Sequence, residues 1–270
     1  MTENPSALIP DAQKSRKPLP VVLHPATRVL CHFVILLTMS EKPEFKLFYW
    51  PGMLGRGEFV RLLFLETQTP FEDVFKDKSF EEAKQMGYGR GQKHFAFPVI
   101  EHGDIVISQT PVICRYLGKK LDHGRLYPNT EKDRLQAEVL MAGVVDVVEE
   151  GCRAWHPIDY NADYDSQKEE AKPFIEYYKT KRLPRWLDFF ETTLKDNYLA
   201  NGELVFVGKQ ISWVDFCIFH FVDGNMFQFP ELFDKENTHL KKFHQAIRDR
   251  PNIKTWYYSD ARPKNNHTIF

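Results

Sequence analysis

The stretch that decides the fold is FKLFYWPGMLGRGEFVRLLFLE, residues 45–66. Residues 45–50 are β-prone and aromatic, and Pro51-Gly52 closes them, which predicts a strand followed by a turn. After the Gly-Arg-Gly loop at 55–57, apolar residues recur at helical spacing from 58 to 66. The stretch therefore predicts a strand, a loop and a helix in close succession.

The residues that follow extend this unit into a mixed sheet. Residues 70–76 predict a second strand, Ser79 with its acidic neighbours opens a short helix, and 87–92 form a loop. Two further strands, 95–101 and 104–108, are joined by a tight hairpin, and 108–121 predicts a helix. The order βαβαββα predicts an α/β domain over 44–122. Pro98 lies within a predicted strand, and because proline cannot donate to a ladder, we expect an edge or a special turn there.

The pattern changes to long helices after the connector at 123–133. Residues 134–155, 174–197, 206–223 and 239–258 carry apolar positions at helical spacing. We expect a disturbance at Pro184 and a helix end at or before Pro251. Ser212 and Asp215 form a capping box, which is a folding feature. The pattern predicts an all-helical domain over 129–260 and a tail over 261–270.

Composition narrows the class of protein. The chain has 270 residues, and 43% hydrophobic with 27% charged residues is typical of a globular protein. The 36 Lys plus Arg against 37 Asp plus Glu give a net charge of −1, which argues against a nucleic-acid partner. The cysteines are scattered without the spacing of a zinc site, so we interpret them as reduced thiols and expect no metal: Cys31, Cys114, Cys152 and Cys217.

The first 38 residues are rich in Pro and polar residues and predict a disordered extension or leader. The apolar run 29–39 is about half the ~20 residues that a membrane span needs, so we expect no span. A secretory signal with a long leader, an organelle transit peptide and an upstream extension outside the working protein stay open. The last is preferred because Met39 directly precedes the domain start, which predicts a cytoplasmic protein, with organelle targeting through residues 1–38 as the alternative.

Several motifs occur in a recognisable order after Met39. They are Tyr49 before the Gly/Arg loop, Phe97-Pro98-Val99, Ser108-Gln109-Thr110, the capping box after FVGK, and Arg250-Pro251. With these motifs the chain resembles the cytosolic glutathione transferases, and among them the tyrosine-type classes alpha, mu, pi and sigma. The resemblance implies a thioredoxin-like α/β domain followed by a helical bundle, glutathione as co-substrate, no metal, and a role in detoxification.

The resemblance also implies roles for individual residues. The Tyr49 hydroxyl would donate to the glutathione thiolate, the charge of Arg56 would assist, and Trp50 would lie beside them. Phe97, held by a cis bond to Pro98, would pair its backbone with the cysteinyl part of glutathione. Two further contacts are implied for the γ-glutamyl group, whose carboxylate would meet Gln109 and Thr110 and whose ammonium would meet Asp146 of a neighbouring subunit. A homodimer is therefore expected.

Two parts of the site are less specified by the sequence. The tryptophan and lysine that the family uses for the glycyl carboxylate are not found at the usual spacings, so Lys93 is the first candidate, with Lys84, Arg90 and Gln92 as substitutes. Residues that could line a pocket for an apolar electrophile are Trp155, His156, Tyr160 and Phe270, although ordinary core or surface aromatics explain them equally well.

The expected function is conjugation of glutathione to a small apolar electrophile. Two alternatives stay open at this point. One is a glutathione-dependent isomerase similar to the sigma-like prostaglandin synthases, and the other is a binding or structural relative without turnover on the same fold.

Overall fold

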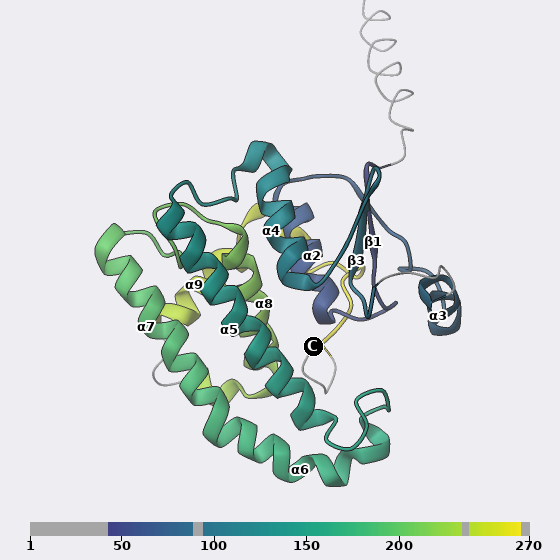
Figure 1. The fold of residues 1–270 in the computed structure, drawn as a ribbon. Coiled ribbons are helices and arrows are strands. Elements are labelled where there is room, and N and C mark those ends of the chain that lie inside the picture. Colours follow the sequence, from purple (N-terminus) through teal and green to yellow (C-terminus); the bar gives the residue numbers. More distant parts are fainter. Residues whose placement is uncertain (1–42, 89–93, 234–237, 266–270) are drawn as a thin grey trace, which may run out of the picture. The chain divides into compact units, whose positions relative to one another are not determined.

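In the computed structural model of the chain, which describes residues 43–88, 94–233 and 238–265, the first half is built on a mixed sheet (Figure 1). Its strands are β1 (Phe45–Phe48), β2 (Phe71–Asp73), β3 (Val99–His102) and β4 (Ile105–Ser108), in the order β2-β1-β3-β4. Strands β1 and β2 are parallel, while β1–β3 and β3–β4 are antiparallel. The predicted leader over 1–38 lies outside the described residues.

Helices cover both faces of this sheet. Helices α2 (Gly55–Glu66) and α4 (Thr110–Lys120) lie on one face and α3 (Phe80–Tyr88) on the other (Figure 1). The predicted start of α3 is confirmed, because the Ser79 N–H donates to the Glu82 carboxylate at 2.8 Å and the Glu82 N–H donates to the Ser79 hydroxyl at 3.2 Å. The predicted order βαβαββα is confirmed.

The second half is helical, as expected. Its helices are α5 (Glu131–Trp155), α6 (Lys168–Tyr177), α7 (Leu183–Asn201), α8 (Trp213–Gln228), α9 (Thr238–Arg248) and α10 (Pro251–Tyr257), with short 3-10 turns at 121–124, 165–167 and 230–233. The capping box of Ser212 and Asp215 opens α8. The expected end before Pro251 is confirmed, since α9 stops at Arg248 and Pro251 begins the next helix.

The expected disturbance at Pro184 takes the form of a π-helical turn over Tyr178–Arg182. The N–H of Leu183 reaches back to the carbonyl of Tyr178, which is one residue further than in an α-helix. Proline has no N–H to continue the ordinary α-helical hydrogen bonds, so the turn before it can hold an extra residue with little loss of hydrogen bonding.

The strands are shorter than the sequence pattern predicts, and β2 covers only Phe71–Asp73 of the expected 70–76. Strand β1 ends at Phe48 instead of residue 50, and β3 begins at Val99 instead of residue 95. The two end residues are paired with each other, and the Phe97–Pro98 bond that precedes Val99 is cis. Because Pro98 cannot donate a ladder hydrogen bond, the pairing stops there and the chain on both strands is available for other contacts.

One hydrophobic core joins the two halves of the described unit. At its centre, Gly118 of α4 lies against Trp213 of α8, so that a side-chain carbon at Gly118 would come within 2.7 Å of the indole. The backbone N–H of Trp213 also donates to the Leu126 carbonyl at 2.9 Å. A smaller cluster lies under α3 and contains Phe48, Phe75, Ala83 and Val99. The helical half is therefore packed directly against α2 and α4.

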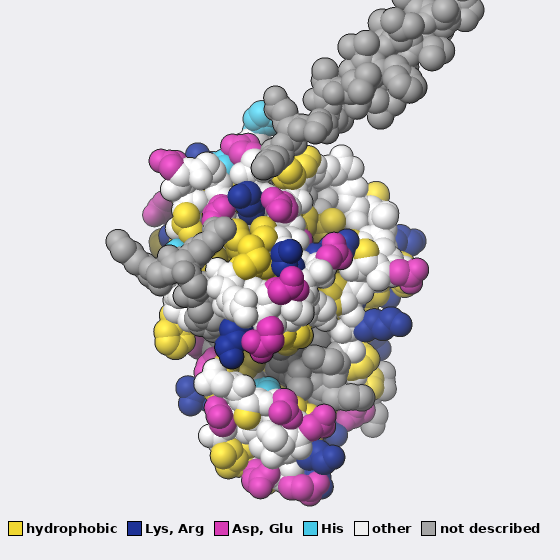
Figure 2. Space-filling view, turned by 90° about the vertical axis from the view of Figure 1, so that its right-hand side faces the viewer, with side chains coloured by type: hydrophobic (Ala, Val, Ile, Leu, Met, Phe, Trp, Pro, Cys, Tyr) yellow, Lys and Arg dark blue, Asp and Glu magenta, His cyan; other side chains and the backbone are white. Residues whose placement is uncertain are grey.

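The face of the molecule on the side of the sheet and α3 is shown in Figure 2. Hydrophobic side chains gather near its centre, and acidic and basic side chains are interspersed around them, as the net charge of −1 would suggest. Among the helices that the structure describes, none combines the length and the apolar character needed to cross a membrane.

Candidate active site

The register of the sheet brings three of the sequence motifs to one end. The last residue of β1 pairs with the first of β3, which pairs with the last of β4. The residues just beyond these strand ends therefore lie next to each other: Tyr49 after β1, Phe97-Pro98 before β3, and Gln109-Thr110 after β4. The N-terminus of α2 lies at the same end, because Tyr49 packs against it. We take this end of the sheet as the candidate active site.

Tyr49 is buried, with 6% of its surface exposed, and its ring lies across the first turn of α2. Its hydroxyl oxygen accepts the backbone N–H of Arg56 at 2.8 Å. Two glycines make room for it: a side-chain carbon at Gly55 would come within 2.1 Å of the hydroxyl oxygen, and one at Gly57 within 2.5 Å of the ring. Since the N–H donates to the phenol oxygen, the hydroxyl keeps its own hydrogen for another acceptor.

The surroundings of Tyr49 keep it protonated near neutrality. Burial raises the pKa of its hydroxyl, and the Arg56 N–H and the Arg61 charge offset this only in part. The Arg61 guanidinium lies 5.7 Å from the centre of the Tyr49 ring. It is held there by Asp73 at 2.7 Å and by the Met53 carbonyl at 3.0 Å. A neutral phenol is the form that can donate a hydrogen bond to an anion.

The side chain of Arg56 reaches toward the helical half of the protein. Its guanidinium is 3.3 Å from the Glu149 carboxylate on α5, and the Tyr160 hydroxyl donates to the same carboxylate at 3.3 Å. Burial raises the pKa of the Cys152 thiol, and the neighbouring Tyr160 and Arg56 side chains offset this only in part. Arg56 and Tyr160, both expected at the site, are thus brought together by Glu149, and Cys152 stays a neutral thiol.

Aromatic packing fixes the loop before β3. The Phe97 ring meets Trp50 edge-on at 4.9 Å, and Trp50 also stacks on Phe80 of α3 at 5.9 Å. Pro98 is buried behind them. The predicted residues Trp50, Phe97 and Pro98 are therefore adjacent, and the backbone at Phe97 lies beyond the last paired residue of the sheet edge.

Gln109 and Thr110 form the N-terminus of α4. Gln109 is exposed and has a φ of 70°, an uncommon backbone conformation for a residue other than glycine. Thr110 is buried, with 3% of its surface exposed. Helix N-termini present unpaired N–H groups that suit a carboxylate. The neighbouring Ser108 hydroxyl is hydrogen-bonded to the His94 ring at 2.8 Å.

The remaining predicted residues lie in different surroundings. Asp146 is exposed on α5, and Lys84 is exposed on α3. Trp155 is only 3% exposed and packs against Tyr178 and Phe229, so it lies in the helical core. His156 bonds the Ala162 carbonyl at 3.0 Å within its own loop. Four candidates lie outside the described residues: Arg90, Gln92, Lys93 and Phe270.

Sequence reasoning missed two residues that contact this site. Glu149 holds Arg56, and His220 of α8 donates from Nε2 to the Gly55 carbonyl at 2.8 Å. His220 is 3% exposed and lies in the otherwise apolar run FCIFHFV. A histidine in so apolar a helix indicates a specific polar partner. The partner lies 165 positions away in the chain, and nothing in the local sequence identifies it.

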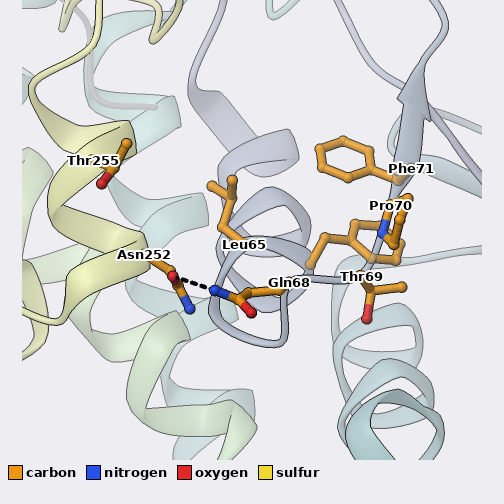
Figure 3. A pocket seen from close by; sticks show the side chains of 8 residues that line it. Leu65, Gln68, Thr69, Pro70, Phe71, Asn252 and Thr255 are labelled. Carbon is orange, nitrogen blue, oxygen red and sulfur yellow. Dashed lines mark hydrogen bonds between the residues drawn. The ribbon is translucent and has the colours of Figure 1, made fainter. Parts of the chain in front are cut away.

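A pocket of about 420 Å³ lies elsewhere, between the end of α2, the start of β2 and α10 (Figure 3). Gln68 and Asn252 both line it, and the Gln68 side chain donates to the Asn252 side chain at 2.9 Å. Because α2 runs from Gly55 to Glu66, this pocket is at the opposite end of the helix from Tyr49. In the part of the chain that the structure describes, no group of three or more His, Cys, Asp or Glu side chains is arranged to hold a metal.

The fold and the site define a class of two-part proteins. Proteins of this class combine a thioredoxin-like sheet, a tyrosine at a strand end and a helical second half. A family model described as "Glutathione S-transferase, C-terminal domain" matches residues 154–260. The glutathione S-transferase of Plasmodium falciparum is 25% identical over 213 residues, which cover 77% of this chain and 92% of that protein. Glutathione S-transferase P 1 of Xenopus laevis is 29% identical over 232 residues, covering 82% and 95%.

Solved structures agree with these relatives. The Pi-class glutathione S-transferase of Onchocerca volvulus has a TM-score of 0.62 at 26% identity and covers 79% of this chain and 92% of its own. A prostaglandin synthase D of Nilaparvata lugens has a TM-score of 0.64 at 22% identity, covers 81% and 98%, and shows the shared fold alone. Together the matches support a cytosolic-type glutathione transferase and its activity as an enzyme.

Proposed function

We propose that the protein conjugates glutathione to small apolar electrophiles, with the Tyr49 hydroxyl stabilising the glutathione thiolate. The observation that carries this proposal is the 2.8 Å hydrogen bond from the Arg56 N–H to the Tyr49 oxygen. This bond holds the phenol at the N-terminus of α2 and leaves its own hydrogen as a donor. The partial positive charge of the helix N-terminus favours an anion at the same place.

The strength of one hydrogen bond is comparable with the free energy needed to ionise the glutathione thiol at neutral pH. A free thiol has a pKa near 8.5, so about 3% is ionised at pH 7, and lowering the pKa by ~2 units would make most of it thiolate. Two units correspond to about 2.7 kcal/mol. A hydrogen bond to a charged group contributes about 1.5 to 3 kcal/mol, so one well-placed phenol is sufficient, and the Arg56 charge adds to it. No metal is required for this step.

The rest of glutathione would lie along the same end of the sheet. The backbone at Phe97, next to the cis bond, is the place for antiparallel pairing with the cysteinyl part. The N–H groups and hydroxyl at Gln109 and Thr110 would receive the γ-glutamyl carboxylate. Trp50 would form the wall between them. For the glycyl carboxylate, Lys93 stays the first candidate.

The electrophile would approach from the side of α5. Tyr160 is 48% exposed and is linked through Glu149 to Arg56, which supports a place for its ring in the electrophile pocket. The burial of Trp155 favours a core role for that residue. The place of Phe270 in this pocket stays a prediction.

We also propose that the protein works as a homodimer. Leu135 and Val139 are one helical turn apart on α5 and are 59% and 56% exposed, and Asp146 continues the same stripe two turns later. Val112 of α4 adds a further apolar side chain that is 41% exposed. Large exposed apolar side chains at helical spacing are typical of an interface. A second subunit on this stripe would place Asp146 at the neighbouring site.

The test combines binding and turnover. We expect the protein to be retained on immobilised glutathione and to conjugate glutathione to a chloronitrobenzene. Tyr49→Phe should lower turnover at pH 6.5 by about ten-fold or more, because about 1.4 kcal/mol of transition-state stabilisation is a factor of ten. Retention without conjugation would support a non-catalytic relative, and isomerisation of an endoperoxide without conjugation would support the isomerase. An unchanged rate in Tyr49→Phe would remove this tyrosine from the mechanism.

A further inference from the structure

The peptide group between Gly55 and Arg56 is hydrogen-bonded at both ends. Its N–H donates to the Tyr49 hydroxyl oxygen at 2.8 Å, and its carbonyl accepts from His220 Nε2 at 2.8 Å. The two bonds belong to one planar group, so the His220 ring, the peptide and the phenol form a continuous chain. His220 comes from α8 in the helical half, and Tyr49 follows the first strand.

We propose that His220 is a positioning residue for Tyr49, which holds and polarises the Gly55–Arg56 peptide so that the phenol becomes a better donor to the glutathione thiolate. This inference rests on the proposed function of Tyr49 and names a residue that supports it. His220 itself would not touch glutathione.

The direction of the chain of hydrogen bonds follows from the groups in it. A carbonyl oxygen has no hydrogen, so the bond to Gly55 requires the hydrogen on Nε2 of His220. Donation to the carbonyl draws electron density from the amide and strengthens its N–H as a donor, and that N–H in turn draws density from the Tyr49 oxygen. Each step favours a stronger hydrogen bond from the phenol to a sulfur anion.

The surroundings of His220 hold it in this role. Its ring packs edge-on against Phe59 of α2 at 4.7 Å, and its surface is 3% exposed. Burial lowers the pKa of His220. The charges of Glu58 and Asp223 act in the opposite direction, and the positive charge of Arg262 lowers the pKa further. The net lowering keeps the ring neutral. A neutral donor can polarise the peptide without placing a full charge beside the Tyr49 site.

A merely structural role and a positioning role predict different results in a double-mutant cycle. The four proteins are the wild-type chain, Tyr49→Phe, His220→Leu and the double variant. The measurements are the apparent pKa of the bound glutathione thiol, from its ultraviolet thiolate band, and kcat/KM at pH 6.5. If His220 acts through Tyr49, His220→Leu should raise the thiol pKa and lower kcat/KM by about three- to ten-fold with Tyr49 present, and do neither in the Y49F background.

Conservative replacements provide the matched control. Glutamine can place an N–H near the position of Nε2, whereas asparagine ends short of it, so His220→Gln should stay near the wild-type thiol pKa and His220→Asn should resemble His220→Leu. This pair carries the test even if His220→Leu does not fold. An equal loss with and without the Tyr49 hydroxyl, or equal values for the Gln and Asn variants, would overturn the inference.

The experiment also separates this inference from the proposal on which it rests. If Tyr49→Phe leaves the thiol pKa and the turnover unchanged, the proposed function fails and His220 has nothing to position. If Tyr49→Phe raises the thiol pKa but His220→Leu behaves like the wild-type protein, the mechanism stands and only the role of His220 is wrong.

Discussion

Gly55 lies directly against the Tyr49 hydroxyl. It has a φ of +39°, and a side-chain carbon there would lie 2.1 Å from the hydroxyl oxygen. Gly103, in the hairpin between β3 and β4, has a similar φ of +61° but nothing within 4 Å of such a carbon. The two glycines therefore separate backbone strain from displacement of the phenol.

We predict that Gly55→Ala lowers kcat/KM by at least about ten-fold, because the phenol must move away from the Arg56 N–H. Gly103→Ala should show the cost of the backbone conformation alone, about 1 kcal/mol of stability for alanine in the left-handed region, and leave turnover near the wild-type value. Steady-state kinetics together with thermal unfolding of both variants check this. Equal turnover in the two variants would show that the position of the phenol is unimportant.

At the scale of the element, α8 connects the helical half to the candidate active site. It starts at a capping box in which Asp215 accepts the Ser212 N–H at 2.7 Å and the Phe206 N–H at 2.8 Å. Two turns later the same helix presents His220 to Gly55. The cap therefore fixes the residue at which α8 starts. It also fixes the position along the helix axis at which His220 contacts α2.

Asp215 also gives α8 a pH dependence whose sign can be stated. Burial raises its pKa from 3.8 to about 6, against the hydrogen bonds that it accepts. Between about pH 4 and pH 6 the folded protein binds a proton that the unfolded chain does not, so this group's contribution to the free energy of unfolding falls as the pH rises.

We predict that Asp215→Asn destabilises the protein and abolishes this contribution. The gap in unfolding free energy between wild type and variant should be about 1 kcal/mol larger at pH 5 than at pH 7. Denaturant unfolding at both pH values measures it. Asp188→Asn, at an exposed position on α7, is the control and should show no such change. A gap that widens toward pH 7 would contradict the prediction.

The elements themselves were largely predictable, because each depends on local signals. Ser79, the Ser212–Asp215 box and Pro251 mark helix ends through side-chain and backbone chemistry within a few residues. The strand ends at Phe48 and Val99 were set too wide, because they depend on pairing across the sheet and on Pro98, which cannot donate a ladder hydrogen bond.

The candidate site was predictable only where the sequence carries a motif. Tyr49, Phe97-Pro98 and Gln109 were found in this way, and the register of the sheet places them together. Glu149 and His220 were missed because their contacts join residues far apart in the chain, and a single sequence holds no record of such pairs. Tertiary packing alone decides which polar side chain reaches α2.

At the scale of the whole molecule, the core is continuous but one surface stripe stays apolar. Ion pairs join the two halves near α2, where the buried Glu66 binds Arg250 and the buried Glu58 binds Arg262. Leu135 and Val139 on α5 join nothing in this way among the residues that the structure describes, and both side chains are more than half exposed. A second copy of the chain would cover this stripe.

The expected outcome is a dimer whose interface and whose Asp146 contact can be separated by mutation. Light scattering should give about twice the chain mass of 31.8 kDa for the wild-type protein and a single chain mass for L135E/V139E, because two charges would be buried without partners. L199E, at a site 71% exposed on α7, should stay dimeric with wild-type kinetics.

D146N should also stay dimeric but show a raised KM for glutathione, since only the ammonium contact is lost. L135E/V139E should show the same rise in KM, because separating the subunits removes that contact as well. A wild-type monomer that conjugates glutathione, or a D146N variant with an unchanged KM, would show that each site is complete within one chain.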